Sequence, residues 1–279
     1  MTIRGFVPVG SRVRPADAEA ARSGGGTIVA ALAVIVILMT ASHSGTAQAA
    51  EATCPKPKVT IHAEALSDKD IQIFEKRLRR AIRKVCAWWG DTFDGPYTVN
   101  IEDNLGSSMA MIPAWRGHRG TMLFRSGKTR SGRSPILHEV THIFAPNANR
   151  FLAEGLAVYA HEHLGGQPAY PNFGRDLYKA VKPDAADADL PLLDSIIAPK
   201  GLMTPDRPKQ LKAYLVAGAF VRYLIETRGM DKFRTLYAMT PMVPHRRIPS
   251  DPDRWQKVYG KSLEALAVEW KAFIASVQG

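Results

Sequence analysis

The chain has 279 residues and a formal net charge of +11, and this length allows one good core in two subdomains that share a cleft. The basic balance favours anionic surroundings, such as envelope polymers, membrane head groups or acidic substrates. No nucleic-acid-binding motif accompanies the charge, so the sequence argues against DNA or RNA as a partner.

Residues 1–50 are typical of an export signal. Arginines precede an uninterrupted apolar run from Thr27 to Met39, and Ala47-Gln48-Ala49 then offers a cleavage site. We therefore expect an exported protein, periplasmic or secreted. Because flanking Ala and Gly could lengthen the run toward the roughly 20 residues that a span needs, an uncleaved N-terminal membrane anchor is the alternative.

Cys54 and Cys86 are the two cysteines of the chain. In an oxidising compartment such a pair forms a disulfide, which here would join the start of the first strand to the first helix. The alternative is two unpaired buried thiols.

Residues 51–165 are expected to form an α+β subdomain with a small mixed β-sheet. Ser67 and Asp70 resemble a capping box at the start of a helix. The alternation of apolar residues and the position of glycines predict these elements: a strand at 58–64, a helix at 67–89, strands at 97–102 and 121–125, and an irregular loop at 106–120.

Four basic residues interleaved with Ser and Gly precede the next helix. They are Arg125, Lys128, Arg130 and Arg133. We interpret this run as a solvated loop. As a hypothesis, the loop borders the cleft and favours acidic substrates.

The stretch from His138 to His142 reads His-Glu-x-x-His, and on a helix its two imidazoles lie on one face with Glu139 between them. Ser134 is expected to cap this helix, and Pro135 suits its first turn. Two imidazoles one turn apart can bind one tetrahedral Zn²⁺ while the carboxylate serves as a general base. The alternative is a helix with two solvated or core histidines.

A catalytic zinc ion needs a third protein ligand. Ala148 occupies the position where the longer metzincin motif has a histidine, and Glu154 is the better candidate because it stands alone in the apolar segment 151–160. The alternative is a surface carboxylate in a first helical turn. We interpret His161 and His163 as a solvated helix end, with a role as ligands left open.

After residue 165 a proline-rich stretch is expected to act as a hinge before a mainly helical subdomain, 166–279. Ala217 and Gly218 would allow a close approach between helices. The predicted elements are helices at 211–227, 231–239 and 263–277, with a turn-rich segment at 241–252.

The metal motif, followed after eleven intervening residues by Glu154-Gly-Leu-Ala-Val-Tyr, resembles the gluzincin metallopeptidases, specifically the peptidase MA-like family. The segments that begin at Tyr214 and Val258 are similar to the helical half of that family. The resemblance implies a zincin-like fold, with an HExxH helix, a glutamate helix and a strand such as 121–125 at the cleft edge.

The same resemblance implies His138, His142 and Glu154 as ligands of Zn²⁺ and Glu139 as the general base. Tyr214, three residues before Ala217, resembles the tyrosine that stabilises the oxyanion in gluzincin aminopeptidases, although an ordinary packing tyrosine is an equal alternative.

We therefore expect an exported zinc metallopeptidase that acts on a peptide or protein substrate. Two alternatives stay open. One is a weakly active or inactive zincin-fold protein that binds an anionic envelope surface, and the other is a hydrolase of non-peptide amides or esters.

Overall fold

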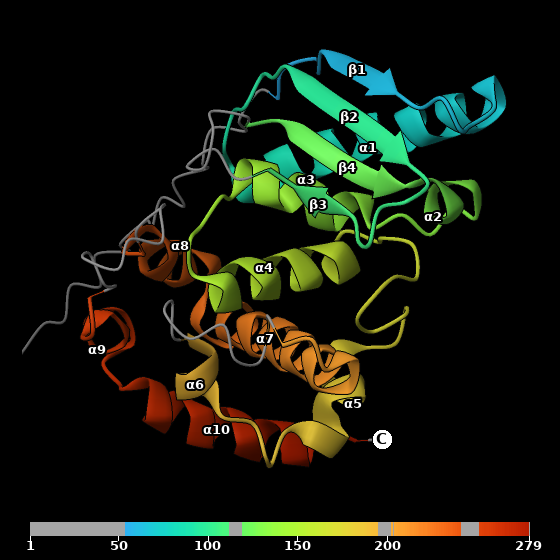
Figure 1. The fold of residues 1–279 in the computed structure, drawn as a ribbon. Helices are drawn as coiled ribbons and strands as arrows, with labels where there is room; N and C mark the ends of the chain where they lie inside the picture. The colour runs from blue at the N-terminus through green and yellow to red at the C-terminus, as the bar shows by residue number, and fades with distance from the viewer. Residues whose placement is uncertain (1–53, 112–118, 195–201, 203, 241–250, 279) are drawn as a thin grey trace, which may run out of the picture. The chain divides into compact units, whose positions relative to one another are not determined.

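The computed structural model describes residues 54–111, 119–194, 202, 204–240 and 251–278, all within one compact unit that spans Gln48–Gly279 (Figure 1). The expected signal segment, 1–50, lies outside the described residues. The fold is α+β, mainly helical with a small mixed sheet, as the sequence predicts. No helix in the described ranges is both long and apolar enough to span a bilayer.

Within the described residues, four strands form the sheet in the order β1-β2-β4-β3. The strands are β1 (Val59–His62), β2 (Tyr97–Glu102), β3 (Met109–Ala110) and β4 (Thr121–Arg125). The first, second and fourth are parallel neighbours, and β3 pairs antiparallel with β4. The placement of 121–125 at the cleft edge is therefore wrong. A two-residue strand from the predicted loop covers β4 and forms the edge instead.

Helix α1 (Asp68–Trp89) makes the crossover between β1 and β2 and packs against the sheet. Its N-terminus confirms the predicted cap, because the Ser67 hydroxyl accepts a hydrogen bond from the Asp70 amide at 3.2 Å. The disulfide between Cys54 and Cys86 is also confirmed, with the two Cα atoms 5.9 Å apart.

The connection from the sheet to the metal motif differs from the prediction in two ways. The expected basic loop contains a short helix, α2 (Ser126–Arg130). Ser134 does not cap α3 (Ile136–Phe144), because the residue at the N-cap position is Pro135. The Ser134 hydroxyl bonds the Thr129 hydroxyl at 2.9 Å, which fastens α2 to the start of α3.

Helix α4 (Arg150–His163) lies between α3 and α7 (Arg207–Arg228), as Figure 1 shows. Its C-cap residue, Leu164, is followed by Gly165 with φ +73°, a conformation that suits glycine. The predicted close approach of small residues occurs here. A Cβ atom at Gly155 would lie 2.6 Å from the carbonyl oxygen of Ala217.

Shorter helices occupy the stretch that the sequence presents as a hinge. The proline-rich segment contains α5 (Leu177–Val181), η2 (Lys182–Asp184) and α6 (Leu190–Asp194). The C-terminal part adds α8 (Met230–Ala238), α9 (Arg254–Tyr259) and α10 (Leu263–Ser276). Residues 241–250 of the predicted turn-rich segment lie outside the described residues.

Two hydrophobic cores stabilise this arrangement. The first joins the sheet, α1 and α3, and includes Leu78, Ile82, Tyr97, Phe124 and Ile143. The second joins α4 to the later helices and includes Phe151, Leu156, Phe220, Phe233, Trp255 and Trp270. The subdomain boundary at residue 165 stays a prediction, but the cores themselves divide earlier, between α3 and α4.

Candidate metal centre

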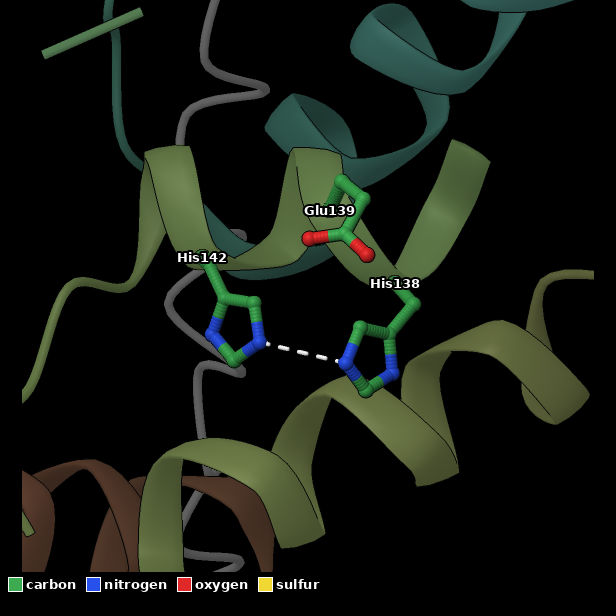
Figure 2. Close-up of side chains that lie close together, drawn as sticks. All are labelled: His138, Glu139 and His142. Atoms are coloured by element: carbon green, nitrogen blue, oxygen red, sulfur yellow. Dashed lines mark hydrogen bonds between the residues drawn. The ribbon is translucent and has the colours of Figure 1, made fainter. Parts of the chain in front are cut away.

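His138 and His142 project from one face of α3 toward α4, with the carboxylate of Glu139 beside them (Figure 2). One helical turn separates the two histidines, so their rings converge. The Nε2 atoms are 3.2 Å apart. The three residues offer ligand atoms that all lie within 4.8 Å of one another, and this group could hold a metal ion.

Glu154 reaches the same point from α4. Its Oε2 atom lies 3.1 Å from Nε2 of His138 and 3.4 Å from Nε2 of His142. Glu154 is deeply buried, with only 6% of its side chain exposed. The third predicted ligand therefore comes together with the first two, although it is supplied by a different helix and a different core.

Anchors in the linker between α3 and α4 fix the relative position of the two helices. The Asn147 amide donates to the carbonyl of Tyr237 at 2.9 Å, and the Tyr237 hydroxyl donates to the carbonyl of Ala145 at 2.7 Å. Asn149 caps α4 by accepting from the amide of Leu152. These contacts hold the linker against α8 and fix the N-terminus of α4, and thereby the position of Glu154 relative to α3.

The donor set and its spacing fit a tetrahedral zinc ion. Ligand atoms about 2.0–2.1 Å from zinc stand about 3.3–3.4 Å apart at the corners of a tetrahedron. The three separations here are 3.1, 3.2 and 3.4 Å. Two imidazoles and a carboxylate are also a donor set that zinc favours.

Arg150 contacts Glu154 from the side away from the histidines. Its Nη2 atom lies 2.5 Å from Oε1 of Glu154, whereas Oε2 faces the histidines. Burial would raise the pKa of Glu154, but His142 and Arg150 outweigh burial and hold this pKa well below its usual value. Sequence reasoning missed Arg150. Its position four residues before Glu154 is the signal that could have found it.

Glu139 lies next to the histidines and is buried. Burial raises its pKa to about 7, while His138 and the backbone amide of Ala110 on β3 act in the opposite direction. A carboxylate with a pKa near neutrality is suited to accept and return a proton. No sequence signal marks Ala110, because β3 has only two residues.

Tyr214 on α7 lies close to this group. Burial raises the pKa of its hydroxyl, Glu154 adds to this effect, and a hydrogen bond with Arg150 opposes it. Tyr214 therefore stays protonated and can donate a hydrogen bond. Its ring also contacts the ring of Tyr170, with the centroids 5.3 Å apart.

The interpretation of His161 as part of a solvated helix end is wrong. Its side chain is buried, and Nε2 donates to the carbonyl of Gln167 at 2.7 Å, because the following turn folds back over the ring. His163 is exposed, as expected. The basic residues near α2 have local partners, including Asp103 for Arg130 and the carbonyl of Gly106 for Arg125.

Comparison with known protein families, with curated proteins and with solved structures found no match to this chain. The interpretation of the site therefore depends on its own geometry.

Proposed function

We propose that the protein is an exported zinc-dependent hydrolase of the gluzincin type that cleaves peptide bonds. One observation carries the proposal. The Nε2 atoms of His138 and His142 and Oε2 of Glu154 lie 3.1–3.4 Å from one another, which is the spacing of ligands around a tetrahedral zinc ion.

When bound, zinc supplies Lewis acidity, which acidifies water and polarises a carbonyl group. Glu139 accepts the proton of the attacking water and returns it to the leaving amine. Its buried position beside the two histidines suits this carboxylate to both steps. Tyr214, protonated and close to Glu154, donates a hydrogen bond to the developing oxyanion.

The edge strand β3 supports an extended peptide as the substrate. The amide of Met111 donates to the carbonyl of Thr121 on β4 at 2.9 Å. The amide of the preceding residue, Ala110, points instead toward the Glu139 carboxylate and lowers its pKa. Successive amides of a strand point in opposite directions, so the outer edge of β3 faces the site. A peptide that pairs with this edge would pass the general base.

Export is supported by the disulfide between Cys54 and Cys86, because such bonds persist in oxidising compartments. An excess of basic over acidic residues suits an anionic envelope.

Zinc analysis by elemental mass spectrometry tests the proposal. We expect near-stoichiometric zinc in the wild-type protein and its loss in His142→Ala and Glu154→Ala. Glu139→Gln should keep the zinc and lose peptide cleavage, which separates a catalyst from a binding protein. Wild-type protein without zinc after metal-replete purification would refute the metal site.

A further inference from the structure

Two exposed aromatic side chains stand on the turn between α4 and α5. Tyr170 is 39% exposed and Phe173 is 56% exposed, and their ring centroids lie 6.2 Å apart in an edge-to-face arrangement. Within the described part of the chain, the other strongly exposed large hydrophobic residues are aliphatic. Exposed apolar side chains that cluster, unlike those scattered singly, can mark a binding site.

The backbone of this turn holds Phe173 in an unusual conformation. Its φ of +52° makes it the one residue other than glycine with a positive φ among those that the structure describes. The left-handed region is unfavourable for a bulky side chain, and such outliers cluster at functional sites. The strain therefore suggests that the direction of this ring matters.

Hydrogen bonds keep the turn rigid. The buried side-chain amide of Asn172 donates to the Glu162 carboxylate at 3.0 Å and to the carbonyl of Arg175 at 2.6 Å. The amide of Phe173 donates to the carbonyl of Ala169 at 2.7 Å. The aromatic pair is thus preorganised, so a ligand that contacts it does not have to order the turn first.

The pair is continuous with the candidate metal centre. The ring of Tyr170 contacts the ring of Tyr214, with the centroids 5.3 Å apart. Tyr214 lies close enough to Arg150 and Glu154 for their charges to act on its hydroxyl, and the guanidinium of Arg150 lies 2.5 Å from the Glu154 carboxylate. A peptide whose carbonyl reaches the oxyanion position beside Tyr214 would bring a neighbouring side chain to these rings.

We propose that Tyr170 and Phe173 form an apolar subsite that selects substrates with an aromatic or other large apolar side chain beside the cleaved bond. This inference rests on the proposed hydrolase function, because it takes the metal centre as the place where the carbonyl binds.

Two hydroxamates test the subsite without depending on turnover. Phenylalanine hydroxamate and glycine hydroxamate carry the same metal-chelating group and differ by one benzyl group. We would titrate each into zinc-loaded protein by calorimetry and compare the affinities. Because the subsite is open on one side, we expect a preference of about tenfold for the aromatic compound, at the low end of apolar discrimination.

Variants then assign the preference to the turn. Phe173→Asn keeps a residue that tolerates positive φ, and Tyr170→Ser removes the second ring. Each should reduce the preference at least threefold and leave the affinity for glycine hydroxamate unchanged. Ile73→Ser, at an aliphatic residue on α1 that is 44% exposed, is the matched control and should keep the full preference.

Equal wild-type affinities for the two compounds would overturn the subsite and leave the metal centre standing. A preference that survives in both turn variants would do the same. If neither hydroxamate binds and the protein takes up no zinc, the proposed function and the subsite fail together.

Discussion

Replacing Arg150 by Met should destabilise the protein most strongly when no metal is bound. Arg150 pairs with Glu154 at 2.5 Å, and Glu154 has only 6% of its side chain exposed. Removing one partner of a fully buried ion pair costs about 3–5 kcal/mol, because the other charge is left uncompensated. Since 40% of the Arg150 side chain is exposed, water weakens the pair, and we expect a loss of about 2 kcal/mol.

Bound zinc should reduce this loss. The ion would place positive charge against Oε2 of Glu154, so the carboxylate would keep a compensating charge after Arg150 is removed. We expect the loss in the free energy of unfolding to fall below about 1 kcal/mol at saturating zinc. Urea denaturation, with and without a chelator, measures both values.

Arg79→Met is the matched control. Arg79 pairs with Glu75 at 2.6 Å and the same four-residue spacing, but the Glu75 side chain is 37% exposed, against 6% for Glu154. This variant should lose no more than about 1 kcal/mol, equally with and without zinc. Equal losses for Arg150→Met in the two conditions, or a loss no larger than that of the control, would refute the role assigned to Arg150.

Three further outcomes follow from the structure. Gly155→Ala should destabilise the protein by about 1–3 kcal/mol in thermal or urea denaturation, because the added methyl group would lie 2.6 Å from the carbonyl oxygen of Ala217. Burial lowers the pKa of His161 to about 4 from an ordinary 6.5. Between pH 6.5 and pH 4 the histidine is therefore protonated in the unfolded chain and neutral in the folded protein. Stability should therefore fall by up to about 3 kcal/mol as the pH drops from about 6.5 to 4, and urea titrations of His161→Gln should lack this contribution. Cys86→Ser should cost about 3–4 kcal/mol in the chain-entropy account, because the disulfide to Cys54 closes a loop with a sequence separation of 32; a smaller change in the urea midpoint would point to residual structure in the unfolded chain.

The sheet was predictable where the pattern was long enough to show alternation. The strands at 97–102 and 121–125 have the predicted bounds, because buried and partly exposed residues alternate along each of them. The edge strand was not predictable, since Met109 and Ala110 are too few to show a period. Ser134 failed as a cap because Pro135 takes the N-cap position, and the Ser134 hydroxyl instead bonds Thr129, five residues earlier in the chain, which the capping pattern does not reveal.

The residues of the candidate metal site were likewise predictable only in part from neighbouring sequence. His138 and His142 lie on one helix, so their spacing alone predicts convergence. Glu154 was identified from the chemistry that a lone carboxylate needs in an apolar segment, together with the family resemblance. The burial of His161 and the contact of Tyr170 with Tyr214 depend on how turns fold back over helices, and they are visible only in three dimensions.

The position of the site between the two cores has a physical consequence. The histidines belong to α3, which packs with the sheet, whereas Glu154 belongs to α4, which packs with the later helices. A metal ion held by all three would link the two cores, so its binding free energy would also stabilise their association. The close packing of Gly155 against Ala217 fixes α4 against α7 and thereby sets the position of Glu154. Changes at this helix contact should therefore alter metal affinity even though neither residue touches the site.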